Sequence, residues 1–119
     1  MASATEAAAR TYAAAWQEPD ADKRARMIED CFAVDGRIAT SGDGIRGRAE
    51  LAAAISELRA DPRGLAVKLV EPIDVQGRKF RLHSVVEQRD GSATRFFDAG
   101  EVDADGRIAI LITFREPAG

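Results

Sequence analysis

The spacing of the apolar residues changes halfway along this chain of 119 residues, and the change limits which folds the chain can form. As far as Ala60 the apolar side chains recur every three or four positions, which is typical of amphipathic helices. From Leu65 they alternate with polar residues, which is typical of strands with one buried face. The switch predicts an α+β fold, in which helices come first and an antiparallel sheet follows. Hairpin turns are indicated by the pairs Gln76-Gly77, Asp90-Gly91 and Asp105-Gly106.

The helical half of the chain divides at capping residues, prolines and glycines. Ser3 and Glu6 have the spacing of a capping box, and the alanine-rich helix that follows them ends at Pro19. The turn-forming residues 41–44 end a short strand. We therefore expect helices from Ser3 to Pro19, from Asp20 or Asp22 to about Ala33 and from about Arg48 to Ala60, with a strand from Val34 to Thr40. The later strands are expected to start near Leu65, Phe80, Ala93 and Ile108.

Charge and rare residue types exclude several classes of function. The chain has 17 Lys and Arg against 20 Asp and Glu, intermingled along the sequence, so we expect no nucleic-acid partner. A single Cys31 and a single His83 cannot form a Cys/His zinc set, so neither a metal site nor a cofactor is expected. No signal peptide is indicated, and no apolar run approaches the roughly 20 residues that cross a bilayer. We expect a soluble, cytoplasmic protein without a membrane partner: one domain over residues 1–119, with frayed ends at 1–4 and 117–119.

Four short segments, in this order, carry a resemblance to a known superfamily. They are the pair Tyr12 and Trp16, then Phe32-Ala33-Val34-Asp35, then Ile45-Arg46-Gly47-Arg48, and finally Asp103-Ala104-Asp105-Gly106-Arg107-Ile108. From about Ala8 to Pro117 the chain resembles the nuclear-transport-factor-2-like superfamily, and within it the SnoaL-like and ketosteroid-isomerase-like proteins. The resemblance implies a cystatin-like cone, in which three helices pack on a strongly curved antiparallel sheet in the order α-α-β-α-β-β-β-β. It implies a pocket but no particular activity, because one fold serves many functions.

The resemblance also implies roles for individual polar residues. In the isomerase branch, a tyrosine and a protonated aspartic acid donate hydrogen bonds to a developing oxyanion, and a second aspartate moves the proton. These positions correspond to Tyr12, Asp98 and Thr40 of this chain. A threonine hydroxyl cannot act as a general base near neutral pH, so steroid-type isomerisation by that route is not expected. The resemblance places His83 facing the pocket, where it would be the candidate replacement for the base.

The same residues also have purely structural interpretations. Tyr12 lies on the apolar face of its helix, where a core tyrosine commonly bonds a backbone carbonyl. Asp98 either faces the pocket, neutral or paired with a cation, or reaches solvent at an edge. Alternation puts His83 on the polar face of its strand, together with Val85. We expect the pocket wall to include Trp16, Phe32, Thr40, Ile55, Val67, Leu69 and Val85.

An apolar row marks the last strand and leaves the oligomeric state open. Every even-numbered residue from position 108 to 114 is apolar: Ile108, Ile110, Ile112 and Phe114. If this row faces away from the helices, it is large enough to predict a symmetric dimer through the outer sheet face. If the row is the core face, a monomer is equally compatible with the pattern. The resemblance favours the homodimer.

Three functions remain as hypotheses from the sequence. The first is the binding of a small, largely apolar organic ligand in the conical pocket, with any chemistry undetermined. The second is an enzyme of the isomerase, cyclase or hydrolase type, in which Tyr12 and Asp98 polarise an oxygen and His83 or a water carries the proton. The third is a non-catalytic dimerisation module. The missing base at Thr40 ranks binding ahead of catalysis.

Overall fold

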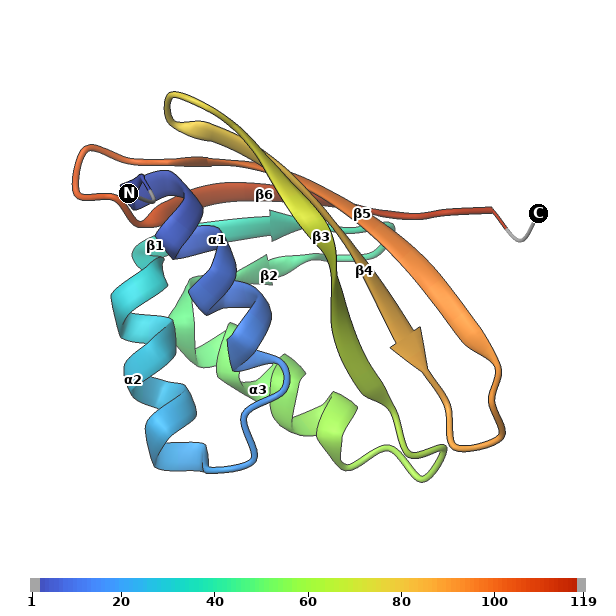
Figure 1. Cartoon of the computed structure of the whole chain (residues 1–119). Helices are drawn as coiled ribbons and strands as arrows, with labels where there is room; N and C mark the ends of the chain where they lie inside the picture. Colours follow the sequence, from blue (N-terminus) through green and yellow to red (C-terminus); the bar gives the residue numbers. More distant parts are fainter. Residues whose placement is uncertain (1–2, 118–119) are drawn as a thin grey trace.

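The structure, a computed structural model, describes residues 3–117. Three helices lie against one face of a six-stranded sheet, which curls around them (Figure 1). The predicted α+β class is confirmed. The helices are α1 (Ala4–Ala15), α2 (Ala21–Cys31) and α3 (Gly47–Arg59). The strands are β1 (Phe32–Ala39), β2 (Ile45–Arg46), β3 (Ala66–Gln76), β4 (Lys79–Glu87), β5 (Ala93–Val102) and β6 (Ile108–Arg115).

The strands lie in the order β2-β1-β6-β5-β4-β3 across the sheet. From β3 to β6 they form the predicted antiparallel meander. β1 lies parallel to β6, a pairing that the sequence pattern does not predict. The strand β2 was not predicted, because two residues are too few to show an alternating pattern.

Side-chain caps fix where the first two helices begin. The Ser3 hydroxyl accepts a hydrogen bond of 3.0 Å from the backbone N–H of Glu6, and the Asp20 carboxylate accepts from two backbone N–H groups of α2. The first helix ends at Ala15 and not at Pro19. Of the ends that were expected to fray, Ser3 and Ala4 form the start of α1, and residues 1, 2, 118 and 119 lie outside the described residues. Within residues 3–117, no helix is both long and apolar enough to cross a membrane.

β-Bulges and glycines bend the sheet around the helices. The pairing of β6 with each of its neighbours, β1 and β5, changes register once along the strands. Close to these shifts a phenylalanine ring covers a glycine: Phe32 covers Gly36, and Phe80 covers Gly100. A Cβ atom on Gly100 would lie 2.7 Å from the Phe80 ring and 2.9 Å from the carbonyl oxygen of Ile110, which is too close for a side chain. Bulges and glycine kinks together curve a sheet of this kind.

The bulge between β5 and β6 also divides the apolar row on the last strand. Ile108 pairs with Val102 and is 0% exposed, inside the core. Beyond the bulge, Ile110, Ile112 and Phe114 lie on the outer face, where Ile112 and Phe114 are 42% and 54% exposed. The prediction that all members of the row share one face is wrong, because the extra residue of a bulge reverses the alternation.

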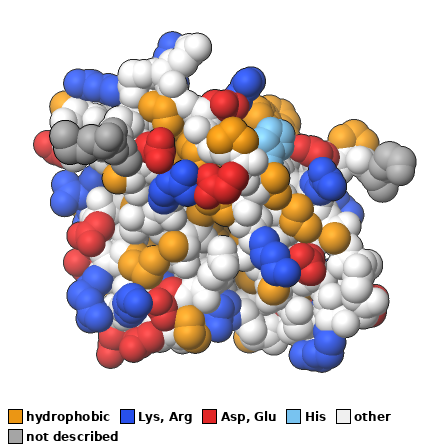
Figure 2. All heavy atoms as spheres, viewed as in Figure 1, with side chains coloured by type: hydrophobic (Ala, Val, Ile, Leu, Met, Phe, Trp, Pro, Cys, Tyr) orange, Lys and Arg blue, Asp and Glu red, His pale blue; other side chains and the backbone are white. Residues whose placement is uncertain are grey.

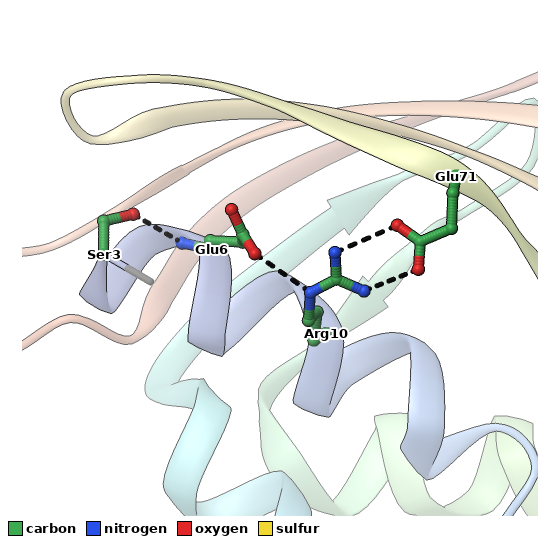
Figure 3. Close-up of polar contacts among 4 residues, drawn as sticks. All are labelled: Ser3, Glu6, Arg10 and Glu71. Atoms are coloured by element: carbon green, nitrogen blue, oxygen red, sulfur yellow. Dashed lines mark hydrogen bonds and ion pairs between the residues drawn. The ribbon is translucent and has the colours of Figure 1, made fainter. Parts of the chain in front are cut away.

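A charged side chain ties the first helix to the edge of the sheet (Figure 3). Arg10 on α1 donates two hydrogen bonds, of 2.7 and 2.9 Å, to the two carboxylate oxygens of Glu71 on β3. Its Nε donates a third, of 3.0 Å, to Glu6 one helical turn earlier. The fork of the guanidinium matches the carboxylate, so the contact fixes orientation more strongly than a single ion pair would.

We expect Gly100→Ala to lower the free energy of unfolding by roughly 1–3 kcal/mol, since the added methyl group must displace the Phe80 ring or the β6 backbone. Urea unfolding of the two proteins measures the difference. Gly42→Ala is the matched control, because its Cβ would have only Thr40 Oγ1 nearby, at 3.9 Å. Equal stability of the Gly100→Ala variant and the wild type would contradict the role assigned to this contact.

Candidate functional site

A cavity of about 150 Å³ lies between α1, the end of α3 and the concave face of the sheet. We call it the conical pocket. Its wall is mostly aliphatic and aromatic, and its volume is comparable to that of a cavity known to hold one benzene ring. The residues that line it are Tyr12, Ala13, Trp16, Ile38, Thr40, Ile45, Leu58, Val67, Leu69, Leu82, Ser84, Val86, Phe96, Asp98 and Thr113.

Asp98 is the ionisable acid of the conical pocket. It lies on β5 between Leu82 of β4 and Thr113 of β6, and it is only 6% exposed. Its Oδ1 atom is buried and has no hydrogen-bond partner among the described residues. Burial raises the pKa of Asp98 to about 6, while the Thr113 hydroxyl and the charge of His83 act in the opposite direction. The carboxyl group can therefore accept or donate a proton close to neutral pH.

Tyr12 brings a phenol into the same cavity from α1. The residue is 4% exposed, and its ring meets the Trp16 ring edge-on with centroids 6.3 Å apart. Burial, together with the negative charge of Asp98, holds the pKa of Tyr12 well above its ordinary value. The phenol therefore stays neutral and keeps its proton as a hydrogen-bond donor.

Of the residues that the structure describes, no lysine, arginine or histidine lines the conical pocket, so its carboxyl group has no counter-charge in the wall. The remaining polar groups of the wall include the hydroxyls of Thr40, Ser84 and Thr113. A pocket of this composition disfavours carboxylate and phosphate ligands, because nothing in it balances a negative charge. Among residues 3–117 there is also no group of three or more His, Cys, Asp or Glu side chains that could hold a metal ion.

The structure brings together most of the predicted site residues. Tyr12 and Asp98 line the conical pocket, and four of the predicted wall residues line it too: Trp16, Thr40, Val67 and Leu69. Thr40 therefore occupies the wall without supplying a carboxylate, and its Oγ1 accepts a hydrogen bond of 3.1 Å from the backbone N–H of Gly42.

The other predicted wall residues lie elsewhere. Phe32 and Ile55 are 0% exposed and belong to the hydrophobic core, outside the lining of the conical pocket. Val85 pairs with Arg95 on the outer face of the sheet, since its neighbours Ser84 and Val86 line the pocket. Placing these three residues in the wall was wrong.

His83 lies on the opposite face of the sheet from the conical pocket. It pairs with Phe97, and the adjacent pair on these strands, Leu82 and Asp98, points inward. The His83 side chain is 47% exposed, its Nδ1 lies 3.1 Å from Oε1 of Glu116, and its ring centroid is 5.1 Å from that of Phe97. Figure 2 shows the pale-blue histidine at the surface beside hydrophobic side chains. Its predicted role as a proton carrier inside the pocket is therefore wrong.

Several wall residues were missed in the sequence analysis. Ser84 shares a strand face with Leu82 and Val86, so the alternation that directs those two residues to the concave side also places the serine there. Thr113 is the cross-strand partner of Asp98, and this pairing depends on the bulge in β6. The remaining missed residues are Ala13, Ile38, Ile45, Leu58, Leu82, Val86 and Phe96.

Comparison with known proteins finds similarity in structure. No family model matches the sequence, and no curated protein matches it. A SnoaL-like family protein from Agrobacterium tumefaciens, proposed to be an isomerase, matches with a TM-score of 0.82 and 25% identity over 93% of this chain and 96% of that one. A protein of unknown function with a cystatin-like fold from Methylobium petroleophilum matches with a TM-score of 0.77 and 21% identity over 98% and 78% of the two chains.

An NTF2-like protein of unknown function from Burkholderia xenovorans also matches, with a TM-score of 0.73 and 16% identity over 98% of this chain and 85% of that one. These similarities extend over nearly the whole of the described chain, so they include the helices, the curved sheet and the elements that form the conical pocket. The chain therefore has the fold of the SnoaL-like, cystatin-like and NTF2-like proteins that it matches.

Proposed function

We propose that this protein binds a small, largely apolar organic molecule in the conical pocket, with Asp98 as the polar anchor. The observation that carries the proposal is the buried Oδ1 of Asp98, which has no hydrogen-bond partner among the described residues and belongs to a residue that lines a mostly apolar cavity. An unsatisfied buried polar group costs about 1–3 kcal/mol. A ligand that completes its hydrogen bonding recovers that free energy and makes binding selective.

An enzyme of the isomerase, cyclase or hydrolase type is the second candidate. It is supported by the shared cavity of Tyr12 and Asp98, since a neutral phenol and a protonated carboxyl group can both donate to an oxygen that gains negative charge. The wall offers no second acid or base, because Thr40 replaces the aspartate and His83 lies outside. Proton transfer would then depend on water, and for this reason binding ranks ahead of catalysis.

We propose further that two copies pair through the outer face of the sheet. The outer-face patch consists of Val70, Val85, Phe97, Ile110, Ile112 and Phe114. Within it, Ile112 and Phe114 on β6 are 42% and 54% exposed, and Val70, on the edge strand β3, is 40% exposed. Exposed apolar side chains gathered on one face favour a partner over water. Such pairing is isologous, with the same patch on both subunits. A lone buried cysteine suits a reducing compartment, so we place the protein in the cytoplasm.

The binding proposal is tested with benzyl alcohol, a neutral ring of a size that suits the cavity. We expect saturable thermal stabilisation with a dissociation constant on the order of 1 mM, as for other ligands of about eight non-hydrogen atoms. Ser84→Phe fills the pocket from β4 and should abolish the effect, and Ser41→Phe, on an exposed loop, should retain it. Equal stabilisation of both variants would contradict a ligand site in this cavity.

Asp98→Asn should make the protein more stable at pH 8. The folded-state pKa is raised from 3.8 to about 6, so the folded chain binds more protons than the unfolded chain between these values. Wild-type stability therefore falls, relative to the variant, as pH rises from about 4 to about 6, and the loss amounts to roughly 2–3 kcal/mol above that window. Urea unfolding at pH 4 and pH 8 measures it.

The exposed turn residue Asp90 provides a control for which the opposite change in stability is expected, because hydrogen bonds from Ser92 lower the pKa of its carboxyl group. Asp90→Asn should therefore lose stability relative to the wild type at pH 8. If Asp98→Asn is instead less stable than the wild type at pH 8, the ionised carboxylate stabilises the fold, and the prediction that its burial destabilises the fold is wrong.

The dimer is tested by sedimentation of wild-type protein and Phe114→Glu. A charge in the centre of an apolar interface should convert a dimer into a monomer. Val34→Glu is the matched control, because Val34 is 73% exposed on β1 and lies outside the outer-face patch. A wild-type monomer, or a Phe114→Glu dimer, would overturn the proposed pairing.

A further inference from the structure

The charges around the conical pocket restrict the kind of ligand that Asp98 can bind. Two basic side chains of the neighbouring strand β4 already have acidic partners: Arg81 bonds Asp74 at 2.7 Å, and His83 bonds Glu116 at 3.1 Å. The third, Lys79, does not line the pocket. On α1, Arg10 is held by Glu71 and Glu6 at the surface. The nearest basic residue on β6, Arg115, is exposed and does not line the pocket. No residue of the wall supplies a counter-ion to the buried carboxylate.

The aromatic residues of the wall are a second, independent feature that favours a positively charged ligand. Tyr12, Trp16 and Phe96 all line the cavity that holds Asp98. The face of an aromatic ring carries negative charge density and attracts a cation within about 6 Å of its centre. Carboxylate and aromatic rings thus favour positive charge, and the wall contains no cation to oppose it.

The hydroxyl groups provide the remaining hydrogen-bond acceptors. A primary ammonium has three N–H donors, and a single carboxylate oxygen accepts only some of them. Thr113 lies opposite Asp98 on the adjacent strand, and Ser84 and Tyr12 line the same cavity. Their oxygens can accept the other donors, while the apolar wall contacts the hydrocarbon part of the ligand.

We propose that the ligand of the conical pocket carries a protonated amine, which pairs with the Asp98 carboxylate, on a small hydrocarbon or aromatic body. This inference rests on the proposed function, because it specifies the chemistry of the molecule bound at that same site. The charged hydrogen bond is stronger than one from a neutral alcohol, and a carboxylate ligand is repelled. The amine thus supplies the counter-ion that the wall lacks.

Three probes of matched shape test the charge preference: benzylamine, benzyl alcohol and benzoate. Their affinities are measured by calorimetry or NMR titration at pH 8, where both the amine and Asp98 are charged. We expect benzylamine to bind about tenfold or more tightly than benzyl alcohol, and benzoate to show no saturable binding. Asp98→Asn should remove the preference for the amine. Glu116→Gln, which removes a carboxylate from the outer face, should retain it.

The outcomes separate this inference from the proposed function. If benzyl alcohol binds and benzylamine binds no more tightly, the pocket takes neutral ligands and only the inference fails. A preference for benzylamine that persists in Asp98→Asn means that the amine binds elsewhere, and this too overturns it. If none of the probes binds the wild-type protein, both the inference and the proposed function fail.

Discussion

The contact between the Phe80 ring and Gly100 is the constraint on which the shape of the molecule depends. The ring takes the space of a side chain at position 100, and the register of β5 and β6 shifts next to it. The shift lets the sheet curl around the helices instead of continuing as a flat surface (Figure 1). A flat sheet would pack directly against α1 and leave no room for a cavity. The pocket therefore depends on the backbone geometry at Gly100.

The same curvature explains how the carboxyl group of Asp98 comes to lie in an apolar interior. Asp98 lies two residues before Gly100, on the concave side, so the bend that opens the cavity keeps its side chain away from bulk water. Burial then raises the pKa of this group to about 6. Above that pH the buried carboxylate weakens the fold, and it is the same group that we propose as the anchor of a ligand.

Regular patterns were readable from the sequence, and irregularities were not. The change of period gave the fold class, and helical spacing put Tyr12 on a buried face. Alternation alone placed His83 on the polar face, and the resemblance that moved it into the pocket was misleading. A bulge leaves no mark in the pattern of residue types, so the reversal between Ile108 and Ile110 could not be foreseen. Nor can apolarity separate core from cavity wall, as Phe32 shows.

The long strand β3, at one edge of the sheet, has a consequence for self-association. An exposed edge strand is a template on which another chain can add a strand and begin aggregation. Here Pro72 interrupts the row of backbone donors, the pairing with β4 shifts between Val70 and Asp74, and Lys68 and Glu71 place charges along the edge. These features hinder the addition of another strand at this edge, so the sheet is protected there from growing from chain to chain.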